Sequence, residues 1–258
     1  MIRFFISFAS RFIPRHHLQR FSAFILKIVG VFYLGKNFED PITGIKYRKL
    51  LPYGRIKSRP NALAPHSMSL ERHRLLWLYL KERTNFFTHE QKVLHIAPEY
   101  CFLKRFKKMK NLTYITADLI SPWAEIKLDV QDMPFDDNQF DVIFCNHVLE
   151  HVTDDKQAMR ELYRVMKPGG FGIFQVPIDC SIGQTLEDAS ISTPELRELH
   201  FGQRDHVRLY GSDYPNRLKD AGFIVTADKF VQNLPSNLAK RYALPADEIV
   251  YLCVKPLT

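Results

Sequence analysis

Residues 140–152, with the sequence FDVIFCNHVLEHV, decide the fold. The first six form a short, apolar and β-branched run after the acidic turn 136–138, a pattern typical of a buried strand. Thr153 then offers an N-cap, and residues 154–166 repeat apolar side chains at helical spacing. The stretch therefore predicts a buried strand that leads through a polar loop into a helix.

A second strand is expected after this helix. Asp154 and Asp155 in its first turn and Lys167 at its end match the helix dipole at both poles, and the Pro-Gly-Gly of 168–170 stops it. Residues 171–176 again form a short apolar run. Because a helix joins two buried strands, we expect parallel strands connected by a right-handed crossover.

Three linked motifs in this region resemble the class I S-adenosylmethionine-dependent methyltransferases of the small-molecule, type 11-like group. They are D-x-x-x-M-P-F-D-D-x-x-F-D-V-I at 129–143, N-H-V-L-E-H-V at 146–152 and E-L-Y-R-V-M-K-P-G-G at 161–170. Linked motifs are more specific than a lone glycine-rich loop. The resemblance implies an α/β fold, a doubly wound, mostly parallel seven-stranded sheet with a C-terminal antiparallel hairpin. The alternative is a generic doubly wound domain with an acidic loop.

The rest of the chain supplies elements for such a sheet. Further strands are expected at 91–96, 112–117, 223–227 and 248–254, the last two as the antiparallel hairpin. Residues 178–205 are polar and lack clear periodicity, so they predict a lid over the acceptor site. Ser212 is expected to cap a helix that ends near Gly222.

Charge and cysteine content argue against several classes of protein. The four cysteines are scattered without short spacing, which favours free thiols in a reducing, cytoplasmic compartment over a disulfide framework. The net charge is +8, and residues 1–38 hold six basic and no acidic residues, which leaves +2 on the other 220. Because an RNA enzyme more often carries its basic surface on the body, nucleic acid is not an expected partner.

Residues 1–38 predict a basic amphipathic helical arm. Residues 1–13 place apolar and polar side chains on opposite faces of a helix, and 21–34 is apolar around a central Lys27. These fourteen residues are too few to span a bilayer, which needs about 20. We expect 1–34 to contact the inner face of the membrane as a peripheral segment. The alternatives are an arm that covers the sheet or a partner subunit, and a targeting peptide, although no cleavage site is evident.

Residues 39–68 are rich in proline and glycine and predict a small lobe before a methyltransferase domain at 69–258. The stretch RPNALAPHSMSLERHR at 59–74 resembles a subgroup in which a zinc-ribbon-like lobe precedes S-L-E-R-H-R. Residues that cannot form a thiolate site occupy the positions of that subgroup's cysteines: Asp40, Thr43, Ala64 and Ser67. We therefore expect a degenerate ribbon-like lobe without zinc, held by apolar packing.

A helix is expected from Leu70 to about Arg83, with Ser69 as its cap. Its later residues are apolar nearly all round, which predicts burial between the lobe and the sheet. The charged group 71–74 is expected to be a solvated first turn, and the alternative is a functional surface.

The loop after the first strand departs from the pattern of the resembled family. The family has V-L-D-I-G-x-G, in which the glycines let the backbone approach the cofactor. This chain has VLHIAPE at 93–99, with His95 in place of aspartate, Ala97 and Glu99 in place of glycines, and Pro98 without an N–H donor. The resemblance favours a variant S-adenosylmethionine site that uses His95, Ala97 and Glu99. The alternative is a site that has lost the cofactor.

Two carboxylates at strand ends complete the expected cofactor site. Asp118, at the end of the second strand, suits two hydrogen bonds from a ribose diol, and the alternative is a plain turn residue. The resemblance assigns Asp129 to the adenine amino group and the backbone of Val130 to a ring nitrogen. It also implies cofactor contacts for Leu119 and Asn146.

Histidines near the acceptor are the candidate catalytic residues, because an oxygen acceptor must lose its proton. His147 follows the fourth strand, beside the expected methyl position. His206 lies in the loop 201–211, which is expected to face the substrate, and the neighbouring Asp205 is expected to orient its ring. The alternative is hydrogen-bonded histidines without a role in proton transfer. His151 is expected to be structural, and the spacing predicts no metal site.

The sequence thus predicts an S-adenosylmethionine-dependent methyltransferase. We expect it to act on a small or lipid-linked acceptor, a saccharide among the candidates, at an oxygen atom. The alternative is a non-catalytic binding or scaffold protein of the same fold that no longer binds the cofactor. RNA methylation is a third hypothesis, which predicts strongly salt-dependent RNA binding.

Overall fold

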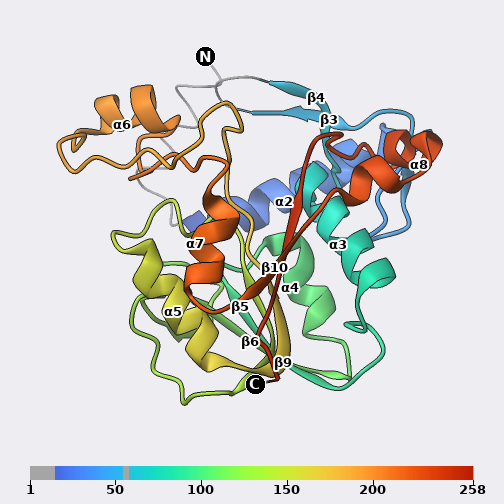
Figure 1. The fold of residues 1–258 in the computed structure, drawn as a ribbon. Helices are drawn as coiled ribbons and strands as arrows, with labels where there is room; N and C mark the ends of the chain where they lie inside the picture. The colour runs from blue at the N-terminus through green and yellow to red at the C-terminus, as the bar shows by residue number, and fades with distance from the viewer. Residues whose placement is uncertain (1–14, 55–57, 258) are drawn as a thin grey trace. The chain divides into compact units, whose positions relative to one another are not determined.

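The computed structural model describes residues 15–54 and 58–257. The chain divides into two compact units, whose elements are drawn in Figure 1. The first comprises Met1–Phe87, Glu99–Arg105 and Lys229–Glu248, and the second comprises Thr88–Pro98, Phe106–Asp228 and Ile249–Thr258. The amphipathic helix predicted at 1–13 lies outside the described residues, and the predicted boundaries at 38 and 68 stay predictions.

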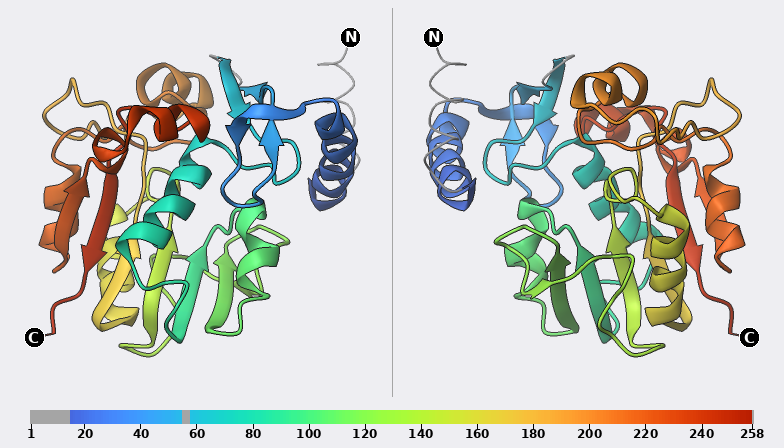
Figure 2. Two further views of the ribbon diagram at one scale, coloured as in Figure 1. Left: turned by 90° about the vertical axis from the view of Figure 1, so that its right-hand side faces the viewer. Right: turned by 90° about the vertical axis from the view of Figure 1, so that its left-hand side faces the viewer.

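A seven-stranded sheet forms the centre of the second unit, with the strand order β10-β11-β9-β8-β5-β6-β7 (Figure 2). Strand β11 is antiparallel to both of its neighbours, and the other pairs are parallel. The strands are β5 (Gln91–Ile96), β6 (Leu112–Asp118), β7 (Ile126–Lys127), β8 (Phe140–Cys145), β9 (Met166–Ile173), β10 (Ile224–Asp228) and β11 (Val250–Val254). The predicted doubly wound sheet with a C-terminal antiparallel pair is confirmed.

The register of the central strands brings three loops to one edge of this sheet. Ile96 at the end of β5 pairs with Ala117 of β6 on one side and with Cys145 of β8 on the other. The strands are parallel, so their carboxyl ends lie together, which is where open α/β sheets bind ligands. This edge holds Asp118, the last residue of β6, and Ala97 and Asn146, which directly follow β5 and β8.

The middle of the sheet is apolar on both faces, as expected for parallel strands covered by helices. Val93 and Leu94 of β5 are fully buried, as is the whole run from Val142 to Cys145 of β8. Helix α5 (Asp155–Val165) packs on the sheet through one face, which buries Ala158, Met159, Leu162 and Val165. This confirms the amphipathic helix predicted from the spacing.

The start of α5 and the start of β9 differ from the prediction. Helix α5 is capped by Asp154, whose Oδ1 accepts the N–H of Gln157 at 2.8 Å, and not by Thr153, which still belongs to the preceding bend. Strand β9 begins at Met166, so the Pro-Gly-Gly stretch lies within the strand, at an irregularity in its pairing with β8. A local bulge therefore accommodates the glycines that predicted a helix stop.

The polar segment 178–205 contains a helix that the sequence pattern did not predict. Helix α6 (Pro194–Phe201) is capped by Thr193, whose hydroxyl oxygen accepts a backbone N–H at 3.3 Å. The next helix, α7 (Tyr214–Asp220), begins two residues after the predicted cap Ser212. The Ser212 hydroxyl instead donates to a carbonyl of the preceding loop at 3.3 Å.

The first unit combines helices with two small antiparallel sheets. Its elements are α2 (Arg15–Val31), β1 (Leu34–Glu39), β2 (Lys46–Tyr47), β3 (Leu51–Tyr53), β4 (Arg59–Leu63), α3 (Glu71–Arg83), most of α4 (Tyr100–Phe106), η1 (Phe230–Asn233) and α8 (Ser236–Arg241). Among the described residues, none of the helices has the length and hydropathy needed to cross a membrane.

Asp40 organises the turn-rich lobe of the first unit. Its buried carboxylate accepts hydrogen bonds from the N–H of Ile42 at 3.1 Å, the hydroxyl of Thr43 at 2.9 Å and the hydroxyl of Ser69 at 3.2 Å. The prediction that Ser69 caps α3 is wrong, because its hydroxyl bonds to Asp40 and the N-cap position of α3 is Leu70. The expected apolar packing is also present, around the buried Tyr47.

Arg74 connects three segments of the first unit. Its guanidinium is fully buried and donates to the carbonyls of Ala62 and Ser69 at 3.0 and 3.1 Å. It also donates to the carbonyls of Tyr242 and Ala243 at 2.7 and 3.0 Å, which fixes the chain after α8 to helix α3. The first turn of α3, predicted to be solvated, thus contains a buried anchor at Arg74.

We predict that Arg74→Met destabilises the protein by about 3 kcal/mol or more, because it leaves buried carbonyls without donors. The matched control is Arg59→Met, which removes a half-exposed ion pair with Glu71 and should cost about 1 kcal/mol or less. Urea unfolding followed by fluorescence measures both. Equal losses for the two variants would contradict the anchoring role.

Candidate active site

Two residues at the sheet edge adopt a left-handed backbone without being glycine. Ala97 has φ 50° and His147 has φ 56°, and they follow the neighbouring strands β5 and β8. Such a conformation costs a non-glycine residue about 1 kcal/mol or more and persists only where the surroundings fix it. The N–H of Ala97 donates to the carbonyl of Ala117 at 2.9 Å, and that of His147 donates to the carbonyl of Gln175 at 2.7 Å. Ala97 thus has a glycine-like backbone conformation in a loop without glycines.

Asp118 is held rigidly with one oxygen left over. Its Oδ1 accepts the N–H groups of Ile120 and Ser121 at 2.7 and 2.6 Å. Its Oδ2 has no hydrogen-bond partner among the described residues. Leu119 beside it is 62% exposed, so an apolar surface adjoins the carboxylate. An oriented acceptor next to an apolar side chain fits the ribose and base of a nucleoside.

Asp129 is fixed by Gln131, a residue that the sequence analysis did not single out. The side-chain amide of Gln131 donates to both Asp129 oxygens at 3.1 and 3.0 Å, and its backbone N–H donates to Oδ1 at 2.9 Å. The side-chain oxygen Oε1 of Gln131 in turn accepts the N–H of Asp154 at 2.8 Å, which links this loop to the start of α5. Val130 between them is buried. The carboxylate keeps lone pairs for a further donor.

The other residues predicted to bind the cofactor lie in different surroundings. His95 is fully buried in β5, where its Nδ1 lies 2.7 Å from the Tyr114 hydroxyl and its ring packs edge-on against Phe144. Asn146 is buried, and its Oδ1 accepts the N–H of Gln175 at 3.2 Å. Glu99 belongs to the first unit. The structure therefore places His95 in the aromatic core of the second unit.

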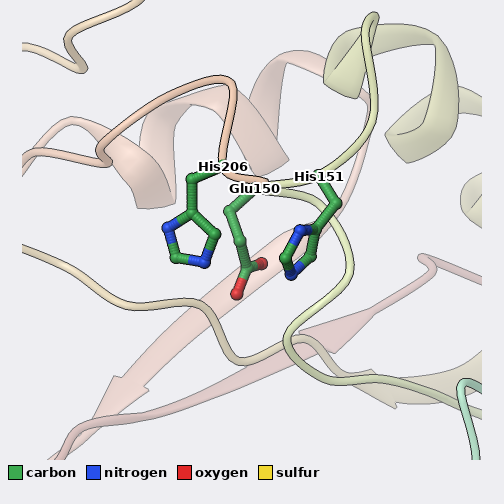
Figure 3. A group of neighbouring side chains, drawn as sticks. All are labelled: Glu150, His151 and His206. Atoms are coloured by element: carbon green, nitrogen blue, oxygen red, sulfur yellow. The ribbon is translucent and has the colours of Figure 1, made fainter. Parts of the chain in front are cut away.

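Four ionisable side chains meet beyond the end of β8. The ligand atoms of Glu150, His151 and His206 all lie within 4.8 Å of one another. Figure 3 shows the Glu150 carboxylate between the two imidazole rings. His147 joins the group through its Nδ1, 3.4 Å from Oε1 of Glu150. The loop after β8 supplies three of the four, and the segment after α6 supplies His206.

His206 is oriented by a backbone carbonyl and not by the predicted Asp205. Its Nδ1 lies 3.1 Å from the carbonyl oxygen of Phe201, an arrangement that places the proton on Nδ1. The Asp205 carboxylate is exposed and lies 3.5 Å from Nδ1 of His151 instead. Burial lowers the pKa of His206, the charge of Glu150 opposes this shift, and the pKa lies below its ordinary value.

The segment 201–211, predicted to face the substrate, contains two buried structural side chains. Arg208 is 3% exposed and donates to the carbonyls of Leu149, Val152 and Thr153 at 2.7, 2.6 and 2.9 Å. Tyr210 is fully buried. Arg208 thus satisfies the carbonyls of the turn that carries Glu150 and His151.

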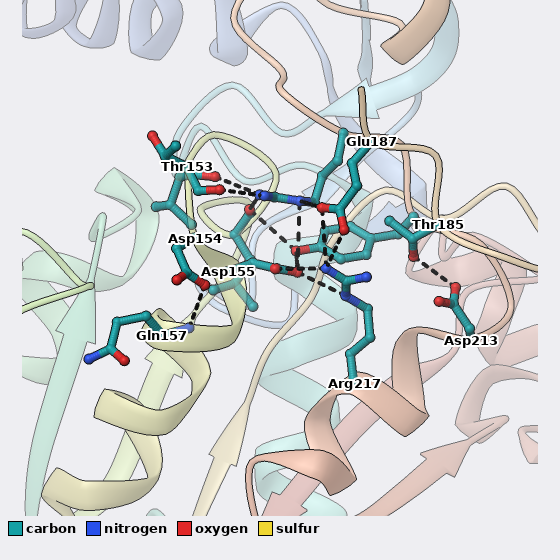
Figure 4. A network of polar contacts seen from close by, with 12 residues as sticks. Thr153, Asp154, Asp155, Gln157, Thr185, Glu187, Asp213 and Arg217 are labelled. Atoms are coloured by element: carbon teal, nitrogen blue, oxygen red, sulfur yellow. Dashed lines mark hydrogen bonds and ion pairs between the residues drawn. The ribbon is translucent and has the colours of Figure 1, made fainter. Parts of the chain in front are cut away.

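Asp155 is the common partner of this polar network, drawn in Figure 4. Arg217 donates to both of its oxygens at 3.0 and 2.8 Å, and the Tyr210 hydroxyl donates to Oδ2 at 2.7 Å. Arg208 lies 3.8 Å away, and Glu187 receives bonds from both arginines. Burial raises the pKa of Asp155, but the arginines and the tyrosine outweigh it, so the pKa lies below its ordinary value.

Comparison with known proteins agrees with this fold. Residues 93–174 match the family model described as "Methyltransferase domain". The ubiquinone/menaquinone biosynthesis C-methyltransferase UbiE of Klebsiella pneumoniae is 44% identical over 111 residues, which cover 38% of this chain and 44% of the relative. The 2-phytyl-1,4-naphtoquinone methyltransferase of Nostoc punctiforme is 46% identical over 46 residues, 18% of this chain and 20% of the relative. The chain thus spans less than half the length of these relatives.

Two solved structures share the fold over most of the chain. The [4+2]-cyclase SpnF has a TM-score of 0.54 at 15% identity, covering 85% of this chain and 92% of the other. A putative sarcosine dimethylglycine methyltransferase from Galdieria sulphuraria has a TM-score of 0.50 at 14% identity, with the same coverage. At these identities the likeness concerns the fold, and one fold serves several activities. The α/β fold with a C-terminal antiparallel strand pair is therefore one that known proteins share.

We predict that Asp155→Asn destabilises the protein by about 3 kcal/mol or more at neutral pH, because it leaves Arg208 and Arg217 with only the partly exposed Glu187 as a shared anion. The folded pKa of Asp155 lies below the ordinary value of about 3.9, so its stabilisation is complete above that pH and is lost as the pH falls through the folded pKa. The difference between wild type and variant should therefore shrink in acid.

Thermal unfolding between neutral pH and pH 3 measures this difference, with Asp220→Asn on the exposed side of α7 as the control. A gap between wild type and Asp155→Asn that stays constant into acid would contradict the proposed charge pairing.

Proposed function

We propose that this protein is an S-adenosylmethionine-dependent methyltransferase that acts on a small or lipid-linked acceptor. The observation that carries the proposal is the oriented pair of carboxylates, Asp118 and Asp129, at the carboxyl edge of a class I methyltransferase sheet. When bound, the cofactor supplies a methyl group on a sulfonium, which is transferred by in-line displacement. The protein's task is then to align the acceptor and to exclude water.

In this proposal, each residue at the sheet edge contacts a different part of the cofactor. Asp118 accepts hydrogen bonds from the ribose diol through its remaining oxygen, and Leu119 provides an apolar contact for the base. Asp129 accepts a hydrogen bond from the adenine amino group, while Gln131 holds the carboxylate in place. Ala97 keeps the backbone turned out of the way in a left-handed conformation, where the resembled family has glycine.

We further propose that the acceptor carries an ionisable hydroxyl, which the group of His147, Glu150 and His206 binds. Each of these side chains has a buried nitrogen or oxygen without a partner among the described residues. The sequence favours methylation of the oxygen itself, a saccharide hydroxyl among the candidates. The name of one relative, a ubiquinone/menaquinone biosynthesis C-methyltransferase, supports a carbon atom as the acceptor instead. Product analysis with a deuterated methyl group distinguishes the two.

Helix α2 supports a lipid surface as the place where this enzyme works, at the inner face of the cytoplasmic membrane. One face of α2 packs on the lobe, where a side chain at Gly30 would meet the His66 ring at 2.5 Å. The opposite face is exposed and apolar, with Lys27 among the exposed residues. The exposed apolar residues of α2 are Phe21, Phe24, Ile25, Ile28 and Val31, and the exposed Phe32 follows directly after the helix. A basic helix with an exposed aromatic stripe suits an anionic membrane surface.

The loop after β5 lacks the glycines of the resembled family, and this supports the alternative, a scaffold protein that does not bind the cofactor. His95 is buried among aromatic rings, and Pro98 supplies no N–H. Calorimetric titration with S-adenosylhomocysteine separates the two functions.

We predict that the wild type binds S-adenosylhomocysteine, and that Asp118→Asn and Asp129→Asn each weaken binding about tenfold or more, the loss of roughly 1.4 kcal/mol. Asp136→Asn, on an exposed carboxylate of the same loop region, serves as the control and should bind like the wild type. If the wild type gives no binding heat, the scaffold function replaces the enzyme.

We also predict that the protein co-sediments with vesicles of phosphatidylcholine and phosphatidylglycerol. The double variant Phe24→Glu/Ile28→Glu should lose more than tenfold in partitioning, because each buried apolar side chain is worth about 1.5–3 kcal/mol. Ser22→Glu/Asn37→Glu adds the same charge at exposed positions and keeps the apolar stripe. Equal sedimentation of the two double variants would show that α2 does not insert its apolar face.

A further inference from the structure

The group beyond β8 contains a buried carboxylate with one oxygen that has no partner among the described residues. Glu150 is 1% exposed, and its Oε2 has no hydrogen-bond partner among the described residues. The only ion pair that the described residues offer it is with Nδ1 of His147, at 3.4 Å. The nearby Arg208 is committed to the network of Asp155 and Glu187. A buried charge in this state is costly unless a ligand neutralises it.

Two imidazoles approach this carboxylate with their other nitrogens already held. Nδ1 of His206 lies 3.1 Å from the Phe201 carbonyl oxygen, and Nδ1 of His151 lies 3.2 Å from the Asp205 carbonyl oxygen. This leaves Nε2 of each ring available, and Nε2 of His206 is buried without a partner among the described residues. Metal-ligating histidines show this pattern, in which a carbonyl or carboxylate fixes the nitrogen that does not bind the metal.

We propose that Glu150, His151 and His206 form a binding site for a divalent transition-metal ion, with Zn²⁺ as the best match. Two imidazoles and one carboxylate are a known ligand set for zinc sites that keep a fourth position open. Nitrogen ligands disfavour Mg²⁺ and Ca²⁺, which prefer oxygen. The ligand atoms lie within 4.8 Å of one another, and zinc at about 2.1 Å from each would bring them to roughly 3.4 Å. Side-chain rotations supply that change.

The backbone holds the two halves of this site together without the metal. The N–H of Val207 donates to the carbonyl of Glu150 at 2.9 Å, which places the residue after His206 against the loop after β8. The sequence did not predict this site, because His206 lies far from Glu150 and His151 in the sequence and no short spacing of ligands links them. His147 is a positioning residue here, since it touches Glu150 and is not one of the three ligands.

The open position of this site suits the acceptor hydroxyl of the proposed function, and this part of the inference rests on that function. A cation there orients the hydroxyl oxygen and favours its anionic form. The acceptor would then be a molecule whose hydroxyl oxygen can occupy the open coordination position of the metal ion.

Calorimetric titration of the chelator-treated protein with ZnCl₂ alone tests the site. We expect one ion per chain, with binding weakened at least 100-fold in Glu150→Gln and in His206→Gln. His200→Gln on exposed α6 serves as the control and should match the wild type. Zn²⁺ should also raise the melting temperature of the wild type and not of the two ligand variants. Cobalt substitution should give a visible absorption spectrum in the wild type alone.

A second measurement covers variants that fold poorly. Without metal, Glu150→Gln should melt at or above the wild-type temperature, because it removes a buried carboxylate whose ion-pair partner among the described residues is His147 alone. Absence of stoichiometric zinc binding, or equal binding in the variants, overturns the proposal. Binding of S-adenosylhomocysteine by metal-free protein is a separate readout, so loss of the metal site and loss of the methyltransferase function are told apart.

Discussion

The buried pairing of Arg208 and Arg217 with Asp155 is the interaction on which the candidate active site depends. Arg208 donates to three carbonyls of the turn between β8 and α5, so the backbone that carries Glu150 and His151 has little freedom. Arg217 binds Asp155 from α7 through both oxygens. These charges lie in the interior, so the carboxylate and the guanidinium groups each require an oppositely charged partner. Their pairing holds three parts of the chain together: the turn after β8, the segment after α6, and helix α7.

The loop after β5 shows how a glycine-rich turn can be replaced. Ala97 keeps the left-handed backbone that glycine adopts freely, and the pairing of its N–H with Ala117 offsets the strain. In the proposed cofactor site, recognition relies on side chains of the next loops, Asp118 and Asp129, each held by local hydrogen bonds. A preorganised carboxylate loses little entropy on binding, so it compensates for backbone donors that the loop lacks.

Local patterns in the sequence predicted the strands β5 and β8 and the helix α5, because apolar periodicity is set by neighbouring residues. Such local patterns could not predict contacts between segments that are distant in the sequence. Arg208 is charged, so the sequence predicted that it faces the substrate. Only the fold shows that its guanidinium is buried and donates hydrogen bonds to three backbone carbonyls. The meeting of His206 with Glu150 and the hydrogen bonds of Arg74 to the chain after α8 likewise depend on tertiary structure.

A crystal structure of the protein with S-adenosylhomocysteine tests the central claim most directly, namely that strand-end carboxylates hold an adenosine without a glycine-rich loop. We expect the ribose hydroxyls within hydrogen-bond distance of Oδ2 of Asp118 and the adenine amino group within hydrogen-bond distance of the Asp129 carboxylate. A nucleoside bound elsewhere, with Asp118 still joined only to Ile120 and Ser121, would contradict it.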